Sequence, residues 1–313
     1  MRLGIVCILV LAGLSYHGRA RSQDTVTVVL SEDSGAYAEF ASQLGSALGK
    51  AGGAKTALRV VTLNNLKDEP AARTGTTQVL IAVGTPAMAA MARKPTAVPV
   101  LNVLVPRASF RSLTRSSART QDNKLFSAVF FDQPWARQLS LIRNAIPGRR
   151  VGVLLGKDSA EFGSSLLAAA RDAHMVVTLE TVLDEADLLP ALKRLLPNSD
   201  ALMAVPDATI YNRSNIATIL LTSYRAKVPL FGFSPSYVKA GALAAVYSEP
   251  GQIAQQVAEI IQKLPANGGL PAPQSPRYFS IAVNAQVRLS LELNVDDEAQ
   301  LLQKIRQLPE TAP

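Results

Sequence analysis

The chain has 313 residues, a formal net charge of +8, 48% hydrophobic residues and 18% charged residues. These values exclude a collagen-like chain and a low-complexity chain too polar to fold, and they predict a globular protein of roughly two lobes. One cysteine and two histidines exclude an intramolecular disulfide, a cysteine-rich zinc site and an iron–sulfur cluster, so we expect no metal and no cofactor.

The first predicted element is an N-terminal leader. Arg2 precedes an apolar run at 3–14, which is shorter than the about 20 residues that span a bilayer. Gly18-Arg19-Ala20 has the small-x-small form of a cleavage site, so we predict a signal peptide at 1–20, with an uncleaved anchor as the alternative. Its removal would take away Cys7 and His17, lower the charge from +8 to +6 through the loss of two arginines, and leave the mature protein in the periplasm.

In the first half of the chain, short runs rich in β-branched residues alternate with longer amphipathic runs. Strands are predicted at 26–30, 58–63, 79–83, 98–103 and 125–131, and helices at 36–50, 86–93 and 134–145. Several strand runs are apolar throughout, which is typical of strands buried on both faces of a parallel sheet.

The second half repeats this pattern from Val151 onward. Strands are predicted at 151–155, 176–182, 201–205, 230–233 and 243–247, and helices at 160–173, 184–196, 209–225, 251–264 and 299–308. The segment 265–276 predicts a surface loop, and 309–313 predicts a disordered tail. The repeat indicates an α/β fold with two Rossmann-like lobes, each built on a parallel sheet.

Polar loops follow many of the predicted strands. In parallel α/β sheets, ligands bind beyond the carboxyl ends of the strands, where helix N-termini present unpaired N–H groups. Such loops occur at 31–35, 84–86, 106–107, 156–159, 206–209 and 234–237. Helix capping alone would explain any one of them, but their recurrence favours a ligand site.

One basic segment has a helical spacing. Arg107, Arg111, Arg115 and Arg119 recur every four residues among serines, which would align them on one face of a helix. An anionic ligand site, a docking surface for a membrane partner and a solvated basic loop all fit, and the weak helix propensity of serine favours the loop. The basic charge also suits nucleic acid, but no recognised nucleic-acid motif is present, so we expect no nucleic-acid partner.

Few residues could support catalysis. His174 is the only histidine after the predicted leader, and it lies at the expected end of a helix, where a cationic side chain suits the helix dipole. No spacing singles out a pair of acids, and Gly-rich phosphate loops are absent from the sequence. We therefore expect no enzyme and no catalytic residues, which leaves an exported hydrolase as the least supported hypothesis.

Four segments carry a resemblance to a known family. They are Ile81-Ala-Val-Gly-Thr-Pro-Ala87, Val205-Pro-Asp-Ala-Thr209, Pro229-Leu-Phe-Gly-Phe-Ser-Pro-Ser-Tyr-Val-Lys-Ala-Gly-Ala-Leu-Ala-Ala245 and Val283-Asn-Ala-Gln-Val-Arg-Leu-Ser-Leu-Glu-Leu293. Together they resemble the periplasmic solute-binding proteins of ABC transporters, in particular the group that includes aromatic amino-acid binders. The second half of the chain carries this resemblance better than the first.

The resemblance implies a type I periplasmic-binding protein fold, in which two lobes close on a small ligand. It implies a first lobe at 24–130 and 248–280 and a second lobe at 131–247 and 281–308, with crossovers near Phe131, Val246 and Ile281. The implied ligand-binding residues come from the loops of both lobes: Ser31, Glu32, Gly84, Thr85, Arg107, Asp158, Ser159, Asp207, Tyr211, Ser234 and Tyr237. Asp207 would pair with a ligand ammonium, and groups near Thr85 and Ser159 would hold a carboxylate.

The implied function is the capture of a small, amino-acid-like ligand by a monomer and its delivery to an ABC permease in the inner membrane. The loops depart from the family pattern, because Ala208 replaces an amide and Phe233 stands where an acid is common. These departures motivate an alternative, a ligand-sensing module that reports to a membrane receptor or kinase. Trp135 would either pack in the hinge or contact the ligand.

Overall fold

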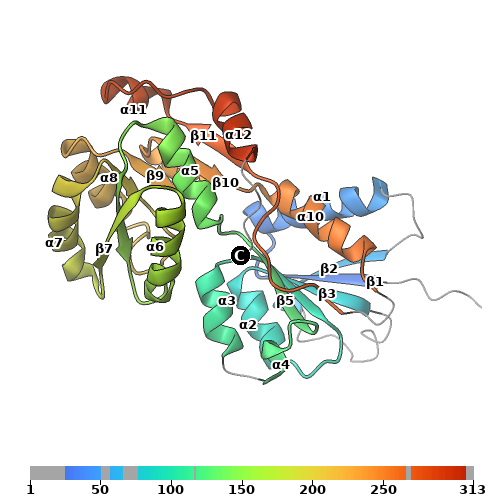
Figure 1. Ribbon diagram of the computed structural model, residues 1–313. Helices are drawn as coiled ribbons and strands as arrows, with labels where there is room; N and C mark the ends of the chain where they lie inside the picture. The colour runs from blue at the N-terminus through green and yellow to red at the C-terminus, as the bar shows by residue number, and fades with distance from the viewer. Residues whose placement is uncertain (1–24, 51–56, 66–76, 116–117, 266–268, 308–313) are drawn as a thin grey trace, which may run out of the picture.

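The computed structural model describes residues 25–50, 57–65, 77–115, 118–265 and 269–307. They form two α/β lobes that lie side by side (Figure 1). The predicted signal peptide and the predicted C-terminal tail lie outside the described residues. Within the described part of the chain, no helix is both long enough and apolar enough to cross a bilayer.

The first lobe is built on a five-stranded parallel sheet with the strand order β2-β1-β3-β4-β5. Its strands are β1 (Thr25–Leu30), β2 (Ala57–Thr62), β3 (Thr77–Val83), β4 (Val100–Val105) and β5 (Phe126–Phe130). Its helices are α1 (Gly35–Lys50), α2 (Thr85–Arg93), α3 (Arg107–Thr114), α4 (Ala118–Gln121) and α10 (Pro250–Gln262), of which α10 packs on α1.

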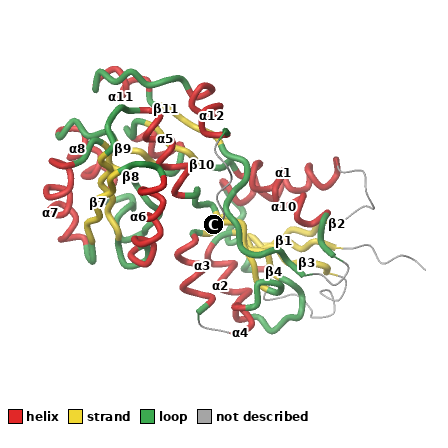
Figure 2. Tube along the Cα trace, in the orientation of Figure 1, coloured by secondary structure: helices red, strands yellow, loops and turns green. Residues whose placement is uncertain are grey.

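Both faces of the first sheet are covered, because successive residues of a strand point to opposite sides. In β3, Ile81 packs with Phe40 of α1 and Val257 of α10, whereas Leu80 packs with Met88 of α2. Figure 2 accordingly shows α1 and α10 on one side of the strands and α2 and α3 on the other. This two-sided burial explains why the strands are apolar throughout.

The second lobe is built on a six-stranded sheet with the order β11-β10-β9-β8-β6-β7. Its strands are β6 (Arg150–Leu155), β7 (Val176–Thr181), β8 (Ala201–Met203), β9 (Leu230–Gly232), β10 (Ala244–Tyr247) and β11 (Ser280–Val283), and β11 alone pairs antiparallel. Its helices are α5 (Trp135–Ala145), η3 (Ala160–Phe162), α6 (Gly163–Asp172), α7 (Glu185–Leu195), η4 (Leu196–Asn198), α8 (Ile216–Arg225), α9 (Pro235–Ala240), α11 (Ala285–Ser290) and α12 (Glu298–Arg306).

The two sheets share one topology. Without β11, the second sheet has the order β7-β6-β8-β9-β10, which repeats the first-sheet order β2-β1-β3-β4-β5. The predicted fold class, two Rossmann-like lobes with parallel sheets, is therefore confirmed. In this topology the strand order reverses between β1 and β3 and again between β6 and β8, and ligands bind beyond the strand ends at such switch points. The exact lobe boundaries that the family resemblance implies stay a prediction.

Local side-chain chemistry explains where the structure departs from the predicted elements. The predicted helix at 209–225 begins only at Ile216, because Asp207 and Asn212 accept backbone N–H groups and hold 207–215 as turns. The predicted loop after β9 contains the short helix α9, with Pro235 in its first turn. The basic segment forms helix α3, so the solvated-loop interpretation is wrong for 107–114.

The lobes are connected by three crossover segments, at 131–134, 248–249 and 276–279. The Gln133 side-chain amide donates to the Ser248 hydroxyl at 2.8 Å, and Ser248 Oγ donates to the Tyr278 carbonyl at 2.6 Å. One serine hydroxyl therefore joins all three crossovers at the hinge. The segment before the third crossover runs along β5, where Gln274 N donates to the Ala128 carbonyl and Phe130 N donates to the Gln274 carbonyl.

Candidate functional site

The switch point of the second lobe holds a buried carboxylate. Asp207 follows β8, is 4% exposed, and accepts hydrogen bonds from Ser159 Oγ at 2.7 Å, Ser159 N at 3.1 Å and Thr209 N at 2.9 Å. A Cβ on Gly156 would lie 2.5 Å from Asp207 Oδ1, so only glycine lets the loop after β6 approach this carboxylate. Asp207 thereby fixes the position of Ser159 at the cleft edge.

The switch point of the first lobe is closed by a neutral hydroxyl. Ser31 follows β1, donates to the Val83 carbonyl at 2.7 Å and accepts from Ala87 N at 3.0 Å in the first turn of α2. Gly84 has a φ of 85°, and a Cβ there would lie 2.7 Å from the Tyr37 ring. Ser31 and Gly84 therefore build the turn that starts α2.

The first crossover brings Arg107 and Asp132 together. The Arg107 backbone N–H donates to Asp132 Oδ2 at 2.7 Å, and its guanidinium lies 5.2 Å from the centroid of the Phe130 ring and donates to Ser275 Oγ at 2.8 Å. Burial raises the pKa of Asp132 to about 6, although the Arg107 N–H group and charge partly oppose this. Burial also lowers the pKa of Arg107. Arg107 Nε is buried and has no hydrogen-bond partner in the part of the chain that the structure describes.

A cavity lies between the lobes at this crossover. It is small, about 10 Å³, which is room for about one water molecule. Trp135 and Phe162 pack against each other with ring centroids 6.4 Å apart, and Trp135 Nε1 donates to Ser165 Oγ at 3.2 Å. The lining residues come from both lobes and the crossover: Arg107, Asp132, Gln133, Trp135, Ser159, Phe162, Val205 and Pro206.

An aromatic cluster lies beyond β8 and β9. Phe233 contacts Tyr237 at 4.6 Å between ring centroids, Tyr211 at 6.1 Å, and Phe131 of the first crossover at 6.1 Å. Burial raises the pKa of Tyr237 to about 12 and raises that of Tyr211 further, so both phenols stay neutral. The Tyr211 hydroxyl is buried, and none of the described residues forms a hydrogen bond with it.

The predicted site residues fall into four groups. Arg107 and Ser159 line the interlobe cavity, and Asp207 holds Ser159. Ser31 and Gly84 build the α2 turn that Thr85 begins, whereas Tyr211, Ser234 and Tyr237 lie in or beside the aromatic cluster. Glu32 and Asp158 are exposed on the loops after β1 and β6. The ligand-binding role of these residues stays a prediction.

Sequence reasoning missed most of the cavity lining. Asp132 and Gln133 were not among the predicted site residues, although they are the first polar residues after β5 and the strand-end rule applies to them as well. For Trp135 the sequence left packing and ligand contact open, and its ring does pack on Phe162. Phe162 carries no such signal, because an aromatic residue at the start of a helix reads as core.

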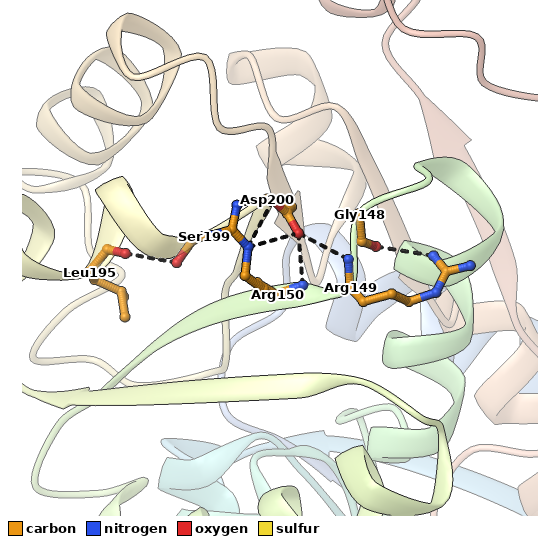
Figure 3. Close-up of polar contacts among 6 residues, drawn as sticks. All are labelled: Gly148, Arg149, Arg150, Leu195, Ser199 and Asp200. Carbon is orange, nitrogen blue, oxygen red and sulfur yellow. Dashed lines mark hydrogen bonds and ion pairs between the residues drawn. The ribbon is translucent and has the colours of Figure 1, made fainter.

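A larger groove of about 770 Å³ lies at the opposite end of the second sheet, between the amino ends of β6, β8 and β9. Figure 3 shows its polar edge, where Asp200 accepts from Arg149 N, Arg150 N and the Arg150 guanidinium. This ion pair and its hydrogen bonds lower the pKa of Asp200. We prefer the small interlobe cavity as the site, because ligands of parallel α/β sheets bind at the carboxyl ends.

The chain matches a protein family and is similar to several solved structures. The family of ABC transporter substrate binding proteins matches residues 55–293. Similar solved structures include an ABC domain from Streptococcus pneumonia in complex with L-Trp (15% identity, TM-score 0.59, 90% of this chain and 98% of that chain). A conserved domain protein from Vibrio cholerae has 20% identity and a TM-score of 0.61, with 90% of this chain and 98% of that chain covered.

A third similar structure is the ligand-free, open form of a substrate binding protein with adhesive properties from Clostridium difficile, with 14% identity, a TM-score of 0.66, and 88% of this chain and 96% of that chain covered. At these identities the structural neighbours show the fold alone. A comparison with curated protein sequences finds no match. Because the family match covers more than half of the chain, this protein belongs to the ABC transporter substrate-binding proteins, which are binding proteins and not enzymes.

Proposed function

We propose that the protein is the periplasmic solute-binding component of an ABC transporter and that it captures an amino-acid-like ligand between its lobes for delivery to an inner-membrane permease. One observation carries the proposal. A guanidinium, a carboxylate and a hydroxyl, from Arg107, Asp132 and Ser159, line a single cavity between the lobes. A small zwitterion needs these groups, since its carboxylate requires donors and its ammonium requires an acceptor.

The polar groups of the cavity belong to both lobes. Arg107 has a buried Nε that finds no partner among the described residues, and a ligand carboxylate would supply the acceptor that this N–H group lacks. Ser159 lines the cavity from the second lobe, and because its hydroxyl already donates to Asp207 and accepts from Gly156 N, it offers the ligand an acceptor lone pair and not a donor. Because Asp207 already accepts from Ser159 and Thr209, we assign to it the positioning of Ser159 rather than a direct contact with the ligand.

The acceptor for the ammonium is Asp132. Its pKa of about 6 means that the carboxylate is ionised at neutral pH and becomes protonated in mild acid. The Trp135 and Phe162 rings supply an apolar surface for the ligand side chain. An aromatic amino acid fits this surface, and the L-Trp complex of the neighbour from Streptococcus pneumonia agrees with that choice.

Ligand entry requires the lobes to separate. A cavity of about 10 Å³ is far smaller than the roughly 300 Å³ or more of ordinary small-molecule sites. A ligand that contacts both lobes binds the closed arrangement better than the open one, and this difference in affinity drives closure.

The test is a thermal-shift and calorimetric screen of the mature chain with amino acids, their amides and their N-acetyl derivatives. We expect stabilisation by at least one free amino acid, and weaker binding when either its carboxylate or its ammonium is blocked. Arg107→Lys should weaken binding at least tenfold, because lysine cannot reproduce the forked guanidinium. The control Arg194→Lys, on the exposed Arg194–Glu180 pair within the second lobe, should leave binding unchanged. No stabilisation by any amino acid at millimolar concentration would overturn the proposal.

A further inference from the structure

Two arginines of the first lobe reach one carboxylate of the second. Arg115 Nη2 donates to Glu161 Oε2, and Arg111 Nη1 lies 3.8 Å from the same oxygen. Arg111 and Arg115 belong to the end of α3, whereas Glu161 lies on η3, just before α6. Figure 1 shows α3 and α6 facing each other across the space between the lobes.

An aromatic contact reinforces this ionic cluster. The Arg111 guanidinium lies 5.5 Å from the centroid of the Phe162 ring, which is a favourable cation–π distance. Phe162 also lines the interlobe cavity and packs on Trp135. The contact therefore extends from the cavity wall to the exposed surface along one side of the molecule.

The cluster uses the same two elements as the candidate ligand site. Arg107 begins α3 at the cavity, and Arg115 lies eight residues further, about 12 Å along the helix axis. On the opposite side, Ser159 lines the cavity two residues before Glu161. Any movement that separates Arg107 from Ser159 must therefore also separate the arginines from Glu161.

The charges favour closure over opening. No acidic residue lies in the first turn of α3, and burial together with a smaller effect of the Arg111 charge lowers the pKa of Arg107, so the arginines repel one another along the helix. Glu161 is the counter-charge that the second lobe provides at the start of η3, where a helical N-terminus also favours an acid.

We propose that Arg111, Arg115, Glu161 and Phe162 form an interlobe latch that stabilises the closed arrangement and slows the release of a ligand. The effect on lobe separation stands alone, and only the effect on ligand release rests on the proposed function. Since Arg111 and Arg115 are 56% and 63% exposed, the latch is weak and sensitive to salt. A weak latch suits a binding protein, because the lobes must still open.

The test measures the distance between spin labels placed on Asn123→Cys in the first lobe and Ser164→Cys in the second, both exposed positions. The mature chain has no cysteine of its own if the leader is removed as predicted, so labelling is specific. At low ionic strength, Glu161→Gln should lower the ratio of closed to open molecules about two- to five-fold. In about 0.5 M NaCl, this difference between the variant and the parent should disappear.

A matched control is available in the second lobe. Glu180 pairs with Arg194 at 2.8 Å, and their side chains are 24% and 57% exposed. The side chains of Glu161 and Arg115 are similarly exposed, at 30% and 63%. Glu180→Gln removes a similar ion pair within one lobe and should leave the distance unchanged. If Glu161→Gln behaves like Glu180→Gln at low salt, the latch is refuted.

Ligand kinetics separate this proposal from the proposed function. With a ligand found by the screen above, Glu161→Gln should raise the dissociation rate about two- to five-fold and leave the association rate nearly unchanged. A changed distance together with no ligand would support the latch and refute the transport proposal. A measurable ligand together with an unchanged distance would refute the latch and support the transport proposal.

Discussion

The two switch points have the same topology and different chemistry. In the first lobe, Ser31 joins the ends of β1 and β3 through a neutral hydroxyl that donates to Val83 and accepts from Ala87. In the second lobe, Asp207 joins the ends of β6 and β8 through a buried carboxylate with three donors. One strand arrangement therefore supports a local turn in one lobe and a charged, cavity-facing loop in the other.

This difference indicates that the two lobes contribute different groups to the walls of the interlobe cavity. A hydroxyl that satisfies two backbone groups needs no further partner, so the first-lobe switch point has little polar capacity left for a ligand. The charged groups of that wall come instead from α3, at Arg107. The Ser159 hydroxyl of the second wall is likewise engaged, by Asp207 and Gly156 N, but unlike Ser31 it lines the cavity, together with an aromatic surface at Phe162.

The largest effect is expected at the second switch point. Asp207→Ala leaves the Ser159 hydroxyl, the buried Ser159 N–H group and the partly buried Thr209 N–H group without an acceptor, and we expect a loss of about 2–4 kcal/mol in the free energy of unfolding. Urea denaturation measures the loss, and ligand titration should show binding weakened at least tenfold. Asp207→Asn retains one acceptor oxygen and should therefore lose less stability and less ligand affinity than Asp207→Ala. A cost below about 1 kcal/mol for Asp207→Ala would break the contrast between the lobes.

An intermediate effect, of opposite sign, is expected at the crossover between the walls. The raised pKa of Asp132 means that the folded protein holds this proton more tightly than the unfolded chain does. Its contribution to stability is therefore present below about pH 4 and is lost as the pH rises through about 6. Asp132→Asn, which keeps an acceptor for Arg107 N, should stabilise the protein by about 1–2 kcal/mol at pH 7.5, and this gain should vanish near pH 4.

Thermal melts across this pH range test the sign. Ligand affinity should fall in Asp132→Asn although stability rises, since the ammonium loses its counter-charge. Asp172→Asn, at an exposed position of α6, serves as the control and should change neither quantity. A pH-independent difference between Asp132→Asn and the parent would refute the assignment of the titrating group.

The smallest effect is expected at the first switch point. Ser31→Ala removes one donor and one acceptor at the start of α2, which should cost about 1 kcal/mol of stability. Because Ser31 does not line the cavity, ligand affinity corrected for stability should stay within about twofold of the parent. A large loss of affinity in Ser31→Ala would give the two switch points the same role.

The sequence predicted the sheets better than the turns. Alternating apolar strands and amphipathic helices identified the fold class, because two-sided burial of parallel strands leaves a strong apolar signal. The late start of α8 was missed, since a side chain such as Asn212 competes with the helix for backbone N–H groups and this competition has no periodic signal. Weak serine propensity also concealed α3, whose Phe110 is buried against Phe126 and Phe130.

The candidate site could be predicted only in part. The strand-end rule identified Arg107 and Ser159, which line the cavity. It did not distinguish Ser31, whose polar atoms are used within its own lobe, from residues that face the other lobe. Glu161 was missed because an exposed acid at the start of a helix has an ordinary capping explanation, and its partner Arg115 lies 46 residues away on another lobe.

The segment that runs along β5 has a consequence for biosynthesis. The β5 edge of the first-lobe sheet is covered only when Gln274 pairs beside Val129. One face of that sheet stays uncovered until Ile253 and Val257 of α10 pack on it. The parallel strands of the second lobe, by contrast, all lie within residues 150–247. The five strands of the first lobe therefore leave the ribosome well before the segments that cover one edge and one face of their sheet, and that exposed edge is a part of the nascent chain that needs protection by a chaperone.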